Sequence, residues 1–345
     1  MPIIARSTFQ PAWWLPGPNL QTLWPALMGR APNPGTVRER LETPDGDFLH
    51  LDRHGPEQAP IVLLLHGLTG SSRSGYVRGM QSALAARGFR SVAMNFRGCS
   101  GEQNHTARAY HSGETGDLDH VYRTLRERHP NTPLAAVGYS LGGNVLLKWL
   151  GEGRGERELF AAVAVSAPLL LDRCASRMDR GFSRIYRDRL VAELKEYVAW
   201  KRDFLLAAGH SGEAEKLRAL GDLAEVRSFW DYDDRVVARL YGFRDVHDYY
   251  GRSSARQYLK DIRVSTLVIH SRDDPFMTPE VVPSESELSD DVSLEINARG
   301  GHVGFIAGAH PGRPRYWLEE RIPGFLQQEL RRTFPAPATL RNTAR

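Results

Sequence analysis

Apolar and polar residues follow one another along the chain in blocks that predict strands separated by helices. Four apolar runs are continuous, which is typical of parallel strands that are covered on both faces. These runs lie at residues 61–65, 91–96, 134–139 and 161–166. Between the first two runs, Val77, Met80 and Leu84 recur at the spacing of one helix face. The order of elements predicts a mostly parallel sheet with helices on both faces.

Departures from this alternation predict how the chain is organised. Residues 37–53 suit a pair of strands that turns at residues 44–47. After Pro168 the strand pattern stops, and a charged, helical stretch follows until strands resume at 265–270 and 292–296. The predicted parts are a Trp- and Pro-rich arm at 1–35 packed on the core, an α/β core at 36–169 and 256–333, a helical cap insertion at 170–255, and a loose basic tail at 334–345.

The pentapeptide at residues 138–142, Gly-Tyr-Ser-Leu-Gly, follows the third apolar run directly. A strand, a sharp turn that carries a serine, and a helix beginning near Gly143 form the pattern of a nucleophile elbow. The glycines fit this setting because neighbouring chains approach the strained turn closely. We therefore predict that Ser140 is a nucleophile.

A serine needs a base and a group that orients the base. In this fold the acid and then the histidine follow the serine along the chain. Asp274 follows the strand that resumes after the insertion, and His302 lies in a glycine-rich loop after the next strand. The predicted catalytic residues are Ser140, Asp274 and His302. The sequence leaves open Asp273 as the acid, and His270 or His310 as the base.

The oxyanion of the tetrahedral intermediate needs backbone N–H donors. Leu141, the residue after the nucleophile, is expected to supply one donor. The loop after the first buried strand, residues 66–70, is expected to supply the other from Leu68. His66 reads as a residue that orders this loop. Gly67, Thr69 and Tyr139 are predicted to contact the substrate.

The charge of the chain adds one local feature. The net charge is only +4, but six arginines stand against two aspartates between Arg173 and Arg189. Such a run is commonly a solvated face. It would also suit an acidic substrate or an anionic membrane surface. The dense tryptophans of residues 13–24 leave a weak membrane-surface contact open in the same way.

Other classes of protein find little support in the sequence. The longest apolar stretch, Leu159 to Leu171, is interrupted and shorter than the roughly 20 residues that span a bilayer. Residues 1–10 lack the pattern of a signal peptide, and two cysteines give no disulfide framework. The residues match neither a nucleic-acid-binding module nor a metal-binding spacing. We therefore expect a cytoplasmic protein without a nucleic-acid partner.

Seven stretches together resemble a specific group of α/β-hydrolases: bacterial hydrolases and carboxylesterases related to abhydrolase-domain esterases and to fungal fatty-acid ethyl-ester synthase/esterases. They are PAWWLPGPNLQTLWP (11–25), LLLHGLTG (63–70), NFRGCSG (95–101), HSGETGDL (111–118), GYSLGGN (138–144), RDDPF (272–276) and GGHVGF (300–305). The resemblance implies the α/β-hydrolase fold and hydrolysis of carboxylic esters with short- or medium-chain acyl groups. It implies a triad of Ser140, Asp274 and His302 that uses neither a metal nor a cofactor.

The predicted cap insertion carries the least resemblance, and it is the part expected to select the substrate. The expected partner is a small-molecule ester, and the chain is expected to be a monomer or a homodimer. A lipase or phospholipase, a thioesterase and an alcohol acyltransferase acting on longer chains are the alternatives among enzymes. A catalytically silent binding protein with a hydrolase fold is the alternative outside them.

Overall fold

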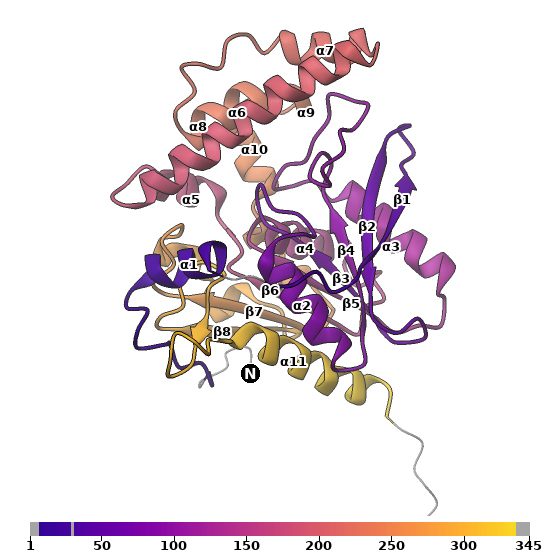
Figure 1. The fold of residues 1–345 in the computed structure, drawn as a ribbon, viewed down its shortest axis with the longest axis vertical. Helices are drawn as coiled ribbons and strands as arrows, with labels where there is room; N and C mark the ends of the chain where they lie inside the picture. The colour runs from indigo at the N-terminus through magenta and orange to yellow at the C-terminus, as the bar shows by residue number, and fades with distance from the viewer. Residues whose placement is uncertain (1–6, 29–30, 336–345) are drawn as a thin grey trace, which may run out of the picture.

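One twisted sheet runs through the part of the chain that the computed structural model describes, residues 7–28 and 31–335 (Figure 1). Its eight strands lie in the order β1-β2-β4-β3-β5-β6-β7-β8. The strands are β1 (Val37–Glu42), β2 (Phe48–His54), β3 (Ile61–Leu65), β4 (Arg90–Asn95), β5 (Leu134–Tyr139), β6 (Ala161–Val165), β7 (Thr266–Ser271) and β8 (Val292–Asn297). The first two are antiparallel to their neighbours and the others are parallel to one another, so the predicted fold class is confirmed.

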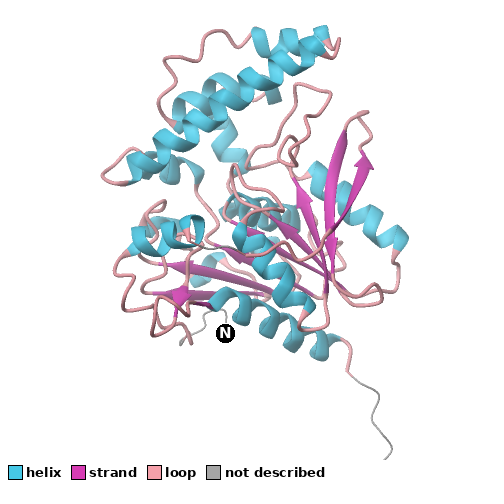
Figure 2. Ribbon diagram, viewed as in Figure 1, coloured by secondary structure: helices cyan, strands magenta, loops and turns pink. Residues whose placement is uncertain are grey.

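Helices cover both faces of the sheet (Figure 2). α2 (Gly75–Ala85) and α11 (Trp317–Thr333) bury their apolar sides on one face, against alternate residues of β3 and β5. α3 (Gly116–Arg128) and α4 (Leu141–Glu152) do the same on the other face, together with the 3-10 helix at Ala255–Asp261. The strands between these layers are wholly buried, as their continuous apolar runs predict.

Between β6 and β7 the chain forms a group of helices that lies over one edge of the sheet (Figure 1). We call residues 171–253 the insertion. Its members are α5 (Leu171–Met178), α6 (Ser183–Ala207), α7 (Ser211–Arg218), α8 (Phe229–Tyr232), a π-helical turn (Asp233–Ala238), α9 (Arg239–Tyr241) and α10 (Val246–Ser253). These helices pack around a hydrophobic cluster of their own, which includes Val198, Leu205 and Tyr249. The boundaries predicted from the sequence at 170 and 255 stay a prediction.

The Trp- and Pro-rich segment folds against the end of the chain. α1 (Pro18–Leu27) lies beside the loop that follows β8, and the short strands β9 (Ile306–Ala307) and β10 (Arg315–Tyr316) pair next to it. The side chain of Gln21 is buried and bonds both the N–H and the carbonyl of Ile306, at 2.8 and 3.1 Å. Residues 1–6 and 29–30 of the predicted arm and 336–345 of the predicted tail lie outside the described residues.

Two short 3-10 helices, Pro279–Val281 and Glu285–Glu287, complete the elements between β7 and β8. No helix within residues 7–28 or 31–335 is both long enough and apolar enough to cross a membrane.

Candidate active site

Ser140 stands on a strained turn between β5 and α4. Its φ of 50° and ψ of −119° lie in a region that residues other than glycine rarely adopt. Neighbouring backbone crowds the turn, because a Cβ added to Gly138 would lie 2.4 Å from the carbonyl oxygen of Gly142. A Cβ added to Gly142 would lie 2.5 Å from the carbonyl oxygen of His66. The helix begins at Leu141, two residues earlier than predicted, because the turn delivers the chain directly into it.

The structure brings Ser140, His302 and Asp274 together in one hydrogen-bonded line. Nε2 of His302 lies 2.8 Å from Ser140 Oγ, and Nδ1 lies 2.8 Å from Asp274 Oδ2. A carboxylate only accepts, so Nδ1 carries the ring proton and Nε2 is left to accept from the serine hydroxyl. Asp274 is buried, and its Oδ1 accepts the N–H of Phe276 at 2.9 Å.

The residues that the sequence left open lie elsewhere. Asp273 accepts the N–H of Gly301 at 3.0 Å, so it holds the histidine loop without touching the imidazole. His310 bonds the N–H of Gly312 at an exposed turn, and His270 is buried within β7. Burial lowers the pKa of His270.

The histidine loop is held by residues that sequence reasoning missed. Thr22 Oγ1, on α1, accepts the N–H of His302 at 2.9 Å. Ser166 Oγ, after β6, accepts the N–H of Val303 at 3.1 Å. Val303 and Phe305 both have positive φ, at 58° and 47°, so the loop is strained where it presents the imidazole. The resemblance at residues 11–25 marked the arm, but nothing in its sequence assigned it to this loop.

Two backbone N–H groups beside Ser140 are left available. Among the residues that the structure describes, neither Leu68 nor Leu141 donates its N–H to a partner. The neighbours of Leu68 are both occupied: Gly67 N–H donates to Tyr76 Oη and Thr69 N–H donates to Tyr110 Oη, each at 2.9 Å. An oxyanion needs N–H donors without another partner, so Leu68 and Leu141 stay the predicted donors.

His66 orders the same loop, as its position after β3 suggests. Nε2 accepts the N–H of Phe96 at 3.1 Å, so Nδ1 carries the proton and donates to the Gly67 carbonyl at 2.8 Å. Burial lowers the pKa of His66 to about 4, which keeps the ring neutral.

The three residues predicted to contact substrate occupy different places. Gly67 faces the nucleophile, since a Cβ added there would lie 3.2 Å from Ser140 Cβ. Thr69 is exposed, with a φ of 54°. Tyr139 is buried against Tyr76, with the ring centroids 4.9 Å apart. A substrate contact for each of them stays a prediction.

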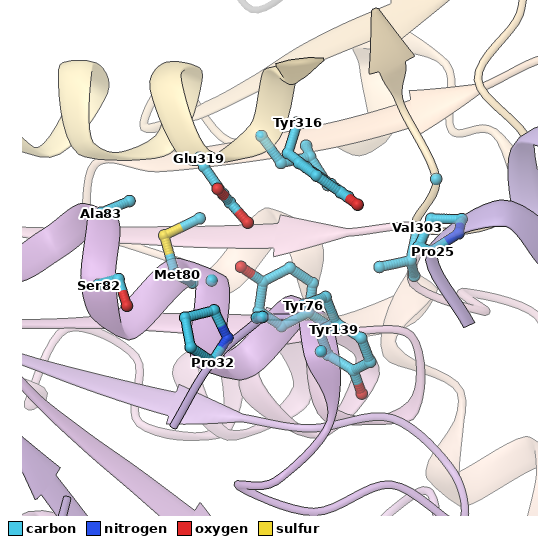
Figure 3. A pocket seen from close by; sticks show the side chains of 15 residues that line it. Pro25, Pro32, Tyr76, Met80, Ser82, Ala83, Tyr139, Val303, Tyr316 and Glu319 are labelled. Carbon is cyan, nitrogen blue, oxygen red and sulfur yellow. The ribbon is translucent and has the colours of Figure 1, made fainter. Parts of the chain in front are cut away.

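Tyr139 and Tyr76 line a cavity of about 450 Å³ on the α2 and α11 side of the sheet (Figure 3). Val303 lines it as well, so the cavity lies behind the nucleophile and histidine loops. Glu319 reaches into it, and burial raises the pKa of this carboxyl to about 7. Neither Ser140 nor His302 is among the residues that line this cavity.

The start of α6 covers the acid loop and the histidine. The ring of Phe276 stacks on His302, with centroids 4.1 Å apart, and Tyr186 packs on Phe276 at 5.0 Å. Ser183 Oγ donates to the carbonyl of Pro275, and Tyr186 Oη donates to Asn19 on α1 at 3.1 Å. The insertion and the arm therefore meet above the site.

Within the described part of the chain, no group of three or more His, Cys, Asp or Glu side chains is arranged to hold a metal ion.

A family model described as the alpha/beta hydrolase fold matches residues 60–309, which contain the whole hydrogen-bonded line. The chain belongs to the α/β-hydrolase family. The match begins before β3 and ends after the histidine loop, so it spans the sheet edge at which the site is built.

Two relatives align with about nine-tenths of this α/β-hydrolase chain. "Putative esterase YheT" of Escherichia coli (strain K12) is 42% identical over 312 residues, covering 89% of each chain. "Phospholipase ABHD3" of Mus musculus is 28% identical over 324 residues, covering 91% of this chain and 77% of the mouse protein. The solved structure of the Pyrococcus furiosus esterase Pf2001 superimposes with a TM-score of 0.53 at 20% identity, over 86% of this chain and 91% of that one. This structural likeness supports the fold alone.

Proposed function

We propose that this α/β-hydrolase is a serine esterase that cleaves carboxylic esters through an acyl-enzyme on Ser140. The observation that carries the proposal is the line Asp274–His302–Ser140, with 2.8 Å at both hydrogen bonds. It ends on a strained elbow beside two available N–H groups. Serine, imidazole and carboxylate in this arrangement are the parts that nucleophilic acyl transfer requires.

The proposed reaction has two halves. Ser140 Oγ attacks the ester carbonyl while His302 Nε2 takes the hydroxyl proton, and Asp274 stabilises the imidazolium. The N–H groups of Leu68 and Leu141 stabilise the oxyanion. The intermediate expels the alcohol, which takes the proton from His302. Water then attacks the acyl-enzyme and gives a proton to His302. The second tetrahedral intermediate breaks its bond to Ser140 Oγ, which takes that proton back from His302, and the carboxylic acid is released.

The names of relatives support ester chemistry, since one is called an esterase and another a phospholipase. Tyr186 of the insertion packs on Phe276, and Phe276 stacks on His302, so an aromatic pair covers one side of the imidazole. We infer that the insertion acts as a cap that selects acyl groups of short to medium length. An alcohol in place of water would make the same enzyme an acyltransferase.

A series of p-nitrophenyl esters tests the proposal. Initial rates measured from acetate to palmitate are expected to give a kcat/KM that peaks at short or medium chains. The physical reason is that Phe276 stacks on His302, and we infer that this ring limits the length of the acyl chain. A peak at palmitate would contradict the proposed short or medium acyl length but would still support an esterase. A folded protein that turns over none of the esters would contradict the proposal that this chain is an esterase.

One surface feature favours a second candidate, an ester held in a lipid aggregate. Phe182 and Ile185, at the start of α6, are 47% and 59% exposed. Arg180 and Arg184 beside them form no ion pair among the described residues. Apolar side chains ringed by arginines suit a surface of anionic lipid.

Binding to anionic vesicles tests this candidate. Binding to phosphatidylglycerol-containing vesicles is expected to weaken about tenfold or more between 0.1 M and 1 M NaCl, because the Debye length falls from about 10 to about 3 Å. The double variant Arg180→Gln, Arg184→Gln should lose most of the binding in sedimentation assays. The matched variant Arg331→Gln, Arg332→Gln, on the last turn of α11, should keep it. Salt-independent binding or equal losses would contradict an electrostatic surface.

A further inference from the structure

Residues 107–112 belong to the loop that connects β4 to α3, and in space they lie between the sheet and the insertion. They have no regular secondary structure, and we call them the strap. The loops of this part of the chain rise from the sheet toward the helices of the insertion (Figure 1). Backbone N–H and carbonyl groups in such a segment need partners from elsewhere. Four backbone groups of the strap find partners on the insertion.

Four side chains, each from a different helix of the insertion, bond the backbone of the strap. On the N–H groups, Glu213 of α7 accepts from Ala107 at 2.7 Å, Tyr241 of α9 accepts from Ala109 at 2.7 Å, and Tyr249 of α10 accepts from Ser112 at 3.0 Å. Lys201 of α6 donates to the carbonyl of Arg108 at 3.0 Å. These bonds fix the backbone on both sides of Tyr110.

Lys201 makes this attachment more than a surface contact. Its side chain is 1% exposed, it forms no ion pair with a carboxylate among the described residues, and burial lowers its pKa to about 8. A buried ammonium is costly unless its donors are satisfied. The strap carbonyl and Tyr197 Oη, at 3.2 Å, are the two acceptors that it contacts among the described residues.

Tyr110 points the other way, into the core. Its ring stacks on Phe96, with centroids 5.2 Å apart and planes 13° from parallel. Its hydroxyl accepts the N–H of Thr69, the residue after Leu68. Thr69 has a φ of 54°, which is costly for a β-branched residue and needs support from its surroundings.

We propose that the insertion positions the oxyanion hole through the strap, with Tyr110 as the positioning residue that holds Thr69 and thereby aims the N–H of Leu68. This inference rests on the proposed esterase function and deepens it. The insertion then does more than select an acyl group, since its docking on the strap sets the geometry that stabilises the transition state. Tyr76, which accepts the N–H of Gly67, braces the loop from the other side.

The variant Tyr110→Phe tests this role, because it removes the hydroxyl and keeps the stacked ring. We expect kcat to fall about tenfold with KM unchanged within twofold, since an aimed oxyanion donor acts in the transition state. Affinity for an alkyl boronic acid, which forms a tetrahedral adduct on the serine, should fall by the same factor. Removing a whole donor costs about 10² to 10³ in rate, so a misaimed one should cost less.

The matched control is Tyr122→Phe. Tyr122 is a buried tyrosine whose hydroxyl, like that of Tyr110, accepts a backbone N–H, that of Glu158 at 2.9 Å, but it lies on α3 away from the site. It should lower the melting temperature about as much as Tyr110→Phe and leave kcat within twofold of wild type. If Tyr110 had only a structural role, Tyr110→Phe would likewise lower the melting temperature and leave kcat within twofold of wild type.

A double-mutant cycle tests whether the insertion acts through Tyr110. Tyr241→Phe frees the N–H of Ala109 and should lower kcat about threefold alone. In the Tyr110→Phe background it should have no further effect on kcat, because the path to Thr69 is already broken. Independent, multiplicative losses would overturn the path through the strap.

The outcomes separate this inference from the proposed function. The inference alone would be overturned if the wild type turns over esters and Tyr110→Phe keeps both kcat and boronate affinity within twofold of wild type. A wild type that turns over no ester and forms no boronate adduct would overturn both. A matched fall in kcat and boronate affinity, with KM unchanged, would support the positioning role.

Discussion

Replacing Ser140 with alanine is expected to lower kcat for every accepted ester by about 10⁶, to the level left by binding and the oxyanion hole. The variant loses the proposed attacking atom, since Oγ lies 2.8 Å from His302 Nε2, the proposed base. The fold should survive, because alanine still fits the turn between Gly138 and Gly142. Initial rates and a thermal melt of the same preparation measure the two effects.

Covalent labelling tests whether Ser140 is the nucleophile without the need for an ester substrate. A fluorophosphonate should add one adduct to the wild type, and peptide mass analysis should place it on Ser140. Ser140→Ala should stay unlabelled, whereas Ser286→Ala, at an exposed serine, should label fully. Turnover retained by Ser140→Ala, or an adduct on another serine, would contradict the assignment of the nucleophile. An unlabelled wild type would favour a silent binding protein.

The sheet was predictable because its signals are local. Each parallel strand is buried on both faces, so a continuous apolar run such as 134–139 marks it without any knowledge of its neighbours. The helices of the core were predictable for the same reason, since one apolar face repeats along each. The start of α4 was misplaced by two residues because glycines usually delay a helix. Here Gly142 and Gly143 serve close packing against β3 and Ala167 instead.

The candidate site was predictable where topology alone brings residues together. The carboxyl ends of β5, β7 and β8 lie at one edge of the sheet, so the residues that follow these strands converge there. The sequence predicts Asp274 as the acid but leaves Asp273 open, because both follow β7 and only the turn geometry directs one toward His302. In the structure Asp274 makes that contact.

The hydrogen bonds that hold the site loops in place could not be predicted from the sequence, because they join distant parts of the chain. Thr22 and His302 are 280 residues apart, and no periodicity connects them. Tyr110 and Thr69 are 41 residues apart, in two segments without regular structure. Such contacts depend on how the arm and the insertion dock on the core, which the local pattern of a sequence does not encode.

Replacing Asp274 with asparagine is expected to lower kcat by about 10⁴ at neutral pH while KM and the fold change little. The amide oxygen keeps the N–H of Phe276, so the amide nitrogen faces His302 Nδ1. That nitrogen donates, which moves the ring proton to Nε2 and leaves the imidazole unable to accept from Ser140. Steady-state kinetics on the best p-nitrophenyl ester measure the loss.

The neighbouring aspartate provides the control, because Asp273→Asn changes the same charge one residue earlier. Its amide oxygen can still accept the N–H of Gly301, so kcat should stay within about threefold of wild type. A large loss in Asp273→Asn with a small one in Asp274→Asn would make Asp273 the acid of the working enzyme. Equal, modest losses would mean that neither carboxylate fixes the imidazole. The hydrogen bond of 2.8 Å between Asp274 Oδ2 and His302 Nδ1 argues for a large loss in Asp274→Asn and a small one in Asp273→Asn, because it holds the imidazole tautomer that Ser140 requires.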